Sequence, residues 1–437
     1  MESSLIVPES CNSRHQTRIN TGEKRVVLML VIPHHRALPG KRYQLNRPRN
    51  LPVTTGLVIA MLSILPGNRL MGQNCAGSSV GFPPLVDLAQ EPHLGIYSVG
   101  LFQGGRNHPP TLHGLEGARR ALGIGPLDAN GDPSPAGSVV LMSVGMSNTS
   151  IEFMQFASRA AIHPDVNHAT LKIVNAAQGG QDASSWQSAA SPVYDTAQSI
   201  LAQRGLTEAQ VQVVWLKQAD AVPQVSLPSP SADAFVLMTR LGNTVRACQT
   251  RYPNLRSIFF SSRIYAGYAT NALNPEPYAY ESGFSVKWLV ESQIDQMSNA
   301  PGDPIAGDLN YNTVTPWLTW GPYLWADGLS PRSDGMVWQC GDFQSDGTHP
   351  GPVGAAKVAD ALVEFFLASP FSRSWFGIRP FADLNADGEQ DLNDVAAFVE
   401  TLLGNEQDPA QIARADFNGD GAVDGLDIQL LVLALGT

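Results

Sequence analysis

A serine follows an apolar segment directly, in a turn that leads into a segment with a helical pattern. Ser147 comes after the apolar run at residues 139–144 and Gly145. The run is short and rich in β-branched residues, which predicts a buried strand, and Gly145 allows a tight turn that exposes the hydroxyl. Free backbone N–H groups and the positive end of a helix would stabilise an oxyanion there. Ser147 is therefore a candidate nucleophile, with helix capping as the alternative role.

A second polar turn, much further along the chain, carries an acid and an imidazole. Asp346 and His349 are three residues apart, directly before a segment with the apolar periodicity of a helix. A serine nucleophile needs a general base, and the imidazole needs a carboxylate that fixes its tautomer and stabilises its charged form. Asp346 and His349 could meet both needs from one loop. The alternative is that Asp346 caps the helix and His349 is a surface residue.

Apolar runs alternate with helical segments between about residues 92 and 370, which predicts an α/β domain. The expected strands are at 139–144, 171–174, 211–216 and 258–261, with helices such as 196–204 and 234–250 between them. This alternation favours a parallel sheet covered by helices on both faces. Ligands of such sheets bind beyond the carboxyl ends of the strands, which is where Ser147 is expected.

Together, and in this order, the serine turn and the Asp-x-x-His turn resemble the SGNH/GDSL hydrolases. The resemblance implies a three-layer α/β/α, flavodoxin-like domain with Ser147 as nucleophile, His349 as base and Asp346 as the orienting acid. Met146 replaces the aspartate of the Gly-Asp-Ser block, which makes the turn similar to the Gly-Gln-Ser-Asn form of carbohydrate acetylesterase branches.

The resemblance also implies an oxyanion hole, which differs here from the family pattern. The backbone N–H of Ser147 is one expected donor, and a glycine after the second strand is another; Gly179 and Gly180 both match, and Gly180 is preferred. The third block of the family supplies an asparagine that this chain lacks. Gln218 is the candidate replacement, through its longer side-chain amide.

Four further residues are candidates for substrate binding. Arg263 and Tyr265 follow the fourth expected strand, near the carboxyl edge of the sheet. Trp320 and Trp325 belong to an aromatic-rich segment, and aromatic faces can stack on sugar rings. The alternative is that the tryptophan rings pack in the core or within loops, as such clusters more often do. For Arg263 and Tyr265 the alternative is pairing with acidic neighbours.

Residues 383–437 contain a duplicated acidic loop with the spacing of a calcium site. Oxygen side chains recur at loop positions 1, 3, 5, 9 and 12, with Gly388 and Gly421 at position 6, where an EF-hand loop makes its sharp turn. Each loop leads into an apolar helical segment. The candidate ligands, including the position-7 residues, are Asp383, Asn385, Asp387, Glu389, Asp391 and Asp394 in the first loop and Asp416, Asn418, Asp420, Ala422, Asp424 and Asp427 in the second.

Aspartate at position 12 and a single helix after each loop resemble a type I dockerin. The resemblance implies a small all-α module that holds two structural Ca²⁺ ions and binds a cohesin-like protein partner. The expected organisation is a leader and signal peptide at 1–75, a hydrolase domain at 92–370, a linker at 371–382 and calcium repeats at 383–437.

Charge is distributed unevenly along the chain. The net charge is −11, but residues 1–72 hold ten Lys and Arg against three Asp and Glu, which leaves 18 basic and 36 acidic residues in the remainder. An acidic surface argues against nucleic acid as a partner. The basic leader before the apolar run at 56–65 is typical of a signal peptide, and the run is too short for a stable membrane span. A buried helix is the alternative.

The sequence therefore favours a secreted serine esterase that acts on acylated carbohydrate or another small ester. The rival hypothesis is an inactive hydrolase-like scaffold held at a surface by its calcium repeats. No pair of carboxylates stands out at the ends of the expected strands, which argues against a glycosidase. In an exported protein Cys248 and Cys340 could form a disulfide, and two free thiols are the alternative.

Overall fold

The computed structural model describes residues 72–88 and 91–436. The apolar run at 56–65 and most of the predicted leader lie outside these residues. Within the described ranges, no helix is both long and apolar enough to cross a membrane.

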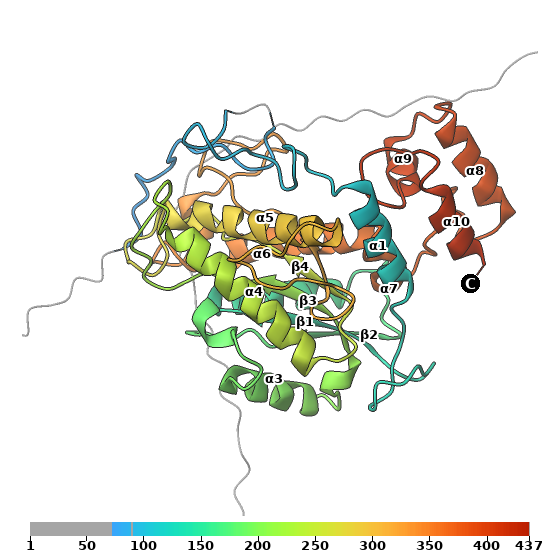
Figure 1. Cartoon of the computed structure of the whole chain (residues 1–437), viewed down its shortest axis with the longest axis horizontal. Coiled ribbons are helices and arrows are strands. Elements are labelled where there is room, and N and C mark those ends of the chain that lie inside the picture. The colour runs from blue at the N-terminus through green and yellow to red at the C-terminus, as the bar shows by residue number, and fades with distance from the viewer. Residues whose placement is uncertain (1–71, 89–90, 437) are drawn as a thin grey trace, which may run out of the picture. The chain divides into compact units, whose positions relative to one another are not determined.

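Five parallel strands form one sheet in the order β2-β1-β3-β4-β5 (Figure 1). Their bounds are β1 Val139–Gly145, β2 Leu171–Asn175, β3 Val211–Lys217, β4 Ser257–Phe260 and β5 Trp317–Trp320. β1 and β3 are buried along their whole length, as a sheet covered on both faces requires. The strand order is the flavodoxin-like one. β2 lies on one side of β1, and β3, β4 and β5 follow on the other side, so the order of strand addition reverses between β1 and β3. The predicted three-layer α/β/α class is confirmed.

Helices flank this sheet and connect its strands. They are α1 Thr111–Leu122, α2 Ser147–Ala160, α3 Pro192–Ala202, α4 Asp233–Arg251, α5 Tyr278–Met297, α6 Pro352–Ala368 and α7 Arg373–Phe376, with short 3₁₀ turns at Ala183–Trp186, Glu208–Gln210 and Cys340–Asp342. α2 packs against α6, and α4 packs against α5 in front of the sheet as Figure 1 is drawn. The helix that begins at Ser147 is thus held between the sheet and a neighbouring helix.

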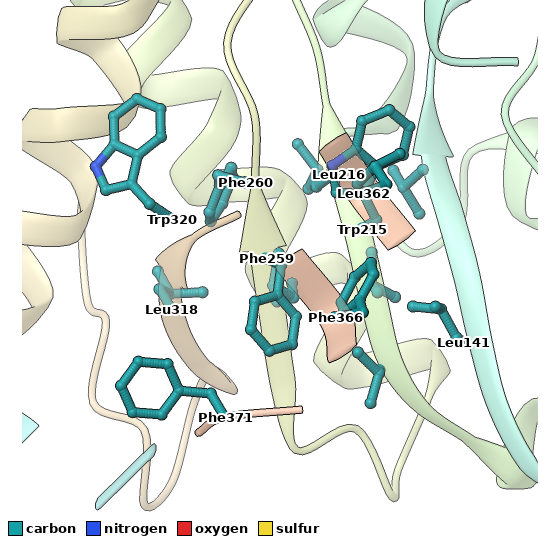
Figure 2. Packing of buried hydrophobic residues seen from close by; sticks show 14 of the residues in the cluster. Leu141, Trp215, Leu216, Phe259, Phe260, Leu318, Trp320, Leu362, Phe366 and Phe371 are labelled. Atoms are coloured by element: carbon teal, nitrogen blue, oxygen red, sulfur yellow. The ribbon is translucent and has the colours of Figure 1, made fainter. Parts of the chain in front are cut away.

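Aromatic side chains fill the core between the sheet and its helices. Figure 2 shows Trp215, Phe259 and Phe366 within one cluster of buried apolar residues. Phe153 of α2 stacks on Trp215 of β3 with ring centroids 5.5 Å apart, and Phe366 of α6 meets Phe259 of β4 edge to face at 5.3 Å. These contacts fix α2 and α6 against the strands whose ends carry the candidate site.

One disulfide joins distant parts of the chain. Cys75 pairs with Cys340, with the two Cα atoms 5.3 Å apart, and Cys248 is a buried free thiol on α4. Neither alternative expected from the sequence holds for Cys340, which pairs with Cys75 and is neither bonded to Cys248 nor a free thiol; Cys248 is free. Cys248 faces the core, where its sulfur lies 3.6 Å from the hydroxyl of Tyr194, whereas the segment around Cys75 packs beside the loop that contains Cys340.

The C-terminal part is all-α, as predicted. Its helices are α8 Leu392–Leu402, α9 Pro409–Ala415 and α10 Ile428–Leu435, of which α9 was not expected. Phe417 of the second acidic loop stacks on Phe398 of α8 with centroids 5.9 Å apart. Residues 371–382, the expected linker, include α7 and the buried rings of Phe371 and Trp375, so this segment is packed into the protein rather than free of it.

Candidate active site

Ser147 is the first residue of α2, directly after the carboxyl end of β1. Met146 before it is extended, so the chain changes from strand to helix within two residues. Gly145 is needed at this point because a Cβ there would lie 2.4 Å from both the carbonyl oxygen of Lys217 and Oγ1 of Thr149. The first N–H groups of a helix have no partner within it, so the turn leaves donors beside the Ser147 hydroxyl.

A chain of hydrogen bonds joins the serine to the two predicted partners. Oγ of Ser147 lies 2.8 Å from Nε2 of His349, and Nδ1 of His349 lies 2.5 Å from Oδ2 of Asp346. The other carboxylate oxygen of Asp346 accepts the backbone N–H groups of Thr348 and His349, both at 3.0 Å. The structure thus brings the hydroxyl, the imidazole and the carboxylate together.

The surroundings of Asp346 keep it ionised. Partial burial would raise its pKa, but the hydrogen bond from the His349 ring and those from the two backbone amides outweigh that cost and lower the pKa below its usual value. Asp346 can therefore accept a hydrogen bond from the Nδ1–H group of His349, which leaves Nε2 free to accept the proton of Ser147.

A cavity of about 300 Å³ opens beside these residues. Ser147 and His349 line it together with apolar, charged and amide groups. The apolar residues are Met146, Ala219, Ala221 and Leu273; the polar ones are Asn148, Asp182, Asp220, Arg263, Asn274 and Thr348, and Gly180 also lines the cavity. A small acyl group with part of an alcohol would fit this volume.

The predicted oxyanion donors do not all reach the cavity. Gly180 lines it with a φ of 76°, a conformation that glycine adopts without strain. Gln218 is buried and its amide donates to the carbonyl of Gln181 at 3.3 Å, so it does not line the cavity. The expected role of Gln218 therefore finds no support: β3 ends at Lys217, and the next side chain turns into the protein.

Only one of the four predicted substrate-binding residues lines the cavity. Arg263 does so, with its Nε donating to Oδ1 of Asn274 at 3.2 Å. Tyr265 is buried and donates to the carbonyl of Gly77 at 2.7 Å. Trp320 and Trp325 are also buried, and their indole N–H groups donate inside the protein at 2.8 Å, to Leu101 and Glu276. Trp320 and Trp325 are therefore core residues, and the sugar-stacking role predicted for them is wrong.

Sequence reasoning missed two amides and an ion pair around the site. Asn148 donates to the carbonyl of Thr348, and Asn274 lies in a long loop where no spacing pointed to it. Glu152 and Lys217 form a fully buried pair beneath the start of α2. Lys217 could have been found as the only charged residue of a strand that is otherwise uncharged and mostly apolar, since a charge there requires a buried partner.

The two acidic loops share one hydrogen-bond pattern. Asp383 at position 1 accepts the N–H groups of residues 387 and 388, and Asp416 accepts those of 420 and 421. At position 12, Asp394 accepts the amides of residues 384, 385 and 391, and Asp427 accepts those of 417, 418 and 424. The duplication seen in the sequence is thus a duplication of structure.

Comparison with known protein families gives a match in this C-terminal part of the chain. Residues 381–435 match the dockerin type I domain. No match is found among the curated proteins.

Two solved structures resemble the remainder at low identity. One, from Bacteroides fragilis NCTC 9343 and provisionally assigned as an acylhydrolase, is 10% identical, covers 56% of this chain and 91% of its own, and has a TM-score of 0.27. The other, from Parabacteroides merdae ATCC 43184 and provisionally assigned as a GDSL-like lipase, is 12% identical, covers 52% and 94%, and has a TM-score of 0.26. At these scores neither likeness bears on the fold or the function.

The residues of the dockerin domain fit calcium by their chemistry. Both loops offer hard oxygen donors around a glycine with a φ of about 90°, at Gly388 and Gly421. Among the described residues no three His, Cys, Asp or Glu side chains form a metal-holding group, so the loop oxygens would have to draw closer around an ion. The pKa of both Asp416 and Asp427 is raised to about 6. Burial is the larger cause, and repulsion from a neighbouring aspartate adds to it. A cation would relieve both costs.

Proposed function

We propose that this chain is a serine esterase that removes small acyl groups from carbohydrate. The observation that carries the proposal is the hydrogen-bonded chain from Ser147 through His349 to Asp346, in which Ser147 and His349 line a cavity of about 300 Å³. The same three residues form the motifs that resemble the SGNH/GDSL hydrolases.

In the proposed mechanism, Ser147 attacks the ester carbonyl as His349 takes its proton. The backbone N–H groups of Ser147 and Gly180 stabilise the oxyanion, and Asp346 stabilises the imidazolium. The imidazolium then protonates the departing alcohol, which leaves an acyl group on Ser147. Water, deprotonated by His349, attacks this acyl-enzyme and releases the carboxylic acid, and the serine regains its proton.

The cavity lining supports a short acyl chain, for which Met146 and Leu273 offer an apolar surface. The amide of Asn274 is already bonded within the protein, since it accepts from Arg263 and donates to the carbonyl of Asp220. The dockerin match supports a role in polysaccharide breakdown, because a dockerin would attach the enzyme to a cohesin-like partner.

We further propose that the dockerin domain holds two structural Ca²⁺ ions and that the protein is exported. In each loop the side chains at positions 1, 3, 5, 9 and 12 would hold the ion, with the position-7 residue contributing its backbone carbonyl. The ion would neutralise the loop and fix its helix. Export is supported by the Cys75–Cys340 disulfide, since such bonds persist in oxidising compartments. Cys75 then stays in the exported protein, so the leader would end before residue 75 and not at it.

Hydrolysis of p-nitrophenyl acetate by the full chain and by Ser147→Ala tests the enzymatic role. The proposal expects the variant to lose nearly all activity, by about 10⁴-fold or more in kcat. Equal rates would reject it and favour a non-catalytic scaffold.

A further inference from the structure

A buried ion pair lies beneath the helix that begins at Ser147. Nζ of Lys217, the last residue of β3, is 2.6 Å from each carboxylate oxygen of Glu152 on α2. Both side chains have no solvent exposure. A fully buried pair of this kind contributes little to stability, because the cost of removing both charges from water is close to the gain from their attraction.

The same two elements are tied at a second point. Oγ1 of Thr149, in the first turn of α2, donates to the carbonyl of Lys217 at 2.6 Å. Glu152 lies one turn further along the helix, so both bonds fix the beginning of α2 to a single residue of β3. The absence of a side chain at Gly145 leaves the space for this close approach.

The pair belongs to a set of charges around the site. The charge of Glu152 is influenced by those of Lys217, Arg263 and His349, and the charge of Lys217 by those of Glu152 and Arg263. Arg263 is influenced in turn by Glu276 and Asp346. Burial raises the pKa of Glu152 and lowers that of Lys217 to about 8, and the mutual attraction opposes both shifts. Removing one partner would leave the other charge buried and uncompensated.

We propose that Glu152 and Lys217 are positioning residues for the nucleophile. Their ion pair fixes the start of α2 on the end of β3, so that Oγ of Ser147 stays within hydrogen-bonding distance of Nε2 of His349. This inference rests on the proposed esterase function. It explains why a costly pair stands beneath an enzyme's nucleophile, where a pair of apolar residues would fill the space at no loss of stability.

The test compares Glu152→Gln with the neutral double variant E152Q/K217M in the full chain. In E152Q we expect the melting temperature to fall by about 10 °C and kcat for p-nitrophenyl acetate by about 100-fold, with KM nearly unchanged. In the double variant no charge is left unpaired, so the melting temperature should recover. Its kcat should remain at least about 10-fold low, because the ion pair is missing and only the Thr149 bond to the backbone of residue 217 still holds the start of α2.

A matched control is the ion pair between Lys287 and Glu291 on α5, with a 3.0 Å contact, away from the cavity. Glu291→Gln should lower the melting temperature and leave kcat within about twofold of wild type. If E152Q does not fold, the double variant still decides the matter.

The two proposals fail in different ways. Wild-type kcat in E152Q/K217M, with activity lost in Ser147→Ala, would overturn the positioning role alone. Wild-type activity in Ser147→Ala would overturn the esterase function and this inference with it.

Discussion

Asp346 in the proposed catalytic loop and Asp416 in the second dockerin loop have similar hydrogen bonds but opposite pKa shifts. Each accepts two backbone amides. The imidazole of His349 helps to lower the pKa of Asp346, whereas burial and the neighbouring Asp420 raise that of Asp416 to about 6. The loop of Asp346 supplies an imidazole to its carboxylate, whereas the loop of Asp416 places the like charge of Asp420 beside it. We therefore expect the first site to be assembled in the protein alone and the second to need an ion.

Removing the charge of Asp346 should give the largest effect on the catalytic side of this comparison. Asp346→Asn keeps the shape of the loop but no longer holds His349 in the required tautomer, so we expect kcat for p-nitrophenyl acetate to fall by about 10⁴-fold. Steady-state kinetics with circular dichroism as a folding control measures this. An Asn variant that retains a tenth of wild-type kcat would show that the carboxylate does not act on His349.

The dockerin side should lose ions one at a time. Asp383→Ala and Asp416→Ala each remove the position-1 ligand of one loop, so calorimetric titration should give two calcium ions for the wild type and one for each variant. The double variant should bind none. Unchanged stoichiometry in either single variant would show that its loop is not a calcium site.

The buried pair predicts an alkaline limit to activity. Because burial lowers the pKa of Lys217 to about 8, Lys217 loses its charge as the pH rises through that value and no longer binds Glu152 as an ion pair. We expect wild-type kcat to fall by about 10-fold between roughly pH 7 and pH 10. The E152Q/K217M variant has no such group, so its kcat should show no such fall. Identical profiles for the two proteins would contradict this prediction.

Gln218 should give the smallest effect. Its amide is bonded to the carbonyl of Gln181 and lies outside the cavity. Gln218→Ala should therefore change kcat by no more than about threefold, in contrast to the 10²-fold or greater loss expected when an oxyanion donor is removed. A loss of that larger size would indicate that Gln218 does donate to the oxyanion.

Local motifs were predictable from the sequence, and long-range packing was not. The strand-turn-helix around Ser147, the Asp-x-x-His turn and the duplicated loops each depend on residues close together in the chain. The buried state of Trp320 and Trp325 depends on partners far away, at Leu101 and Glu276, and spacing carries no signal for them. The same holds for Cys75 and Cys340, which are 265 residues apart. β5 was missed because its aromatic residues suit a sugar platform as well as a strand.

The most direct test of the central claim is fluorophosphonate labelling of the full chain, with peptide mapping, in calcium and in EDTA. The preassembled site predicts a label on Ser147 at rates that agree within about twofold in both conditions, and its loss in His349→Ala. No label on Ser147, or a label that forms only with calcium, would contradict the account.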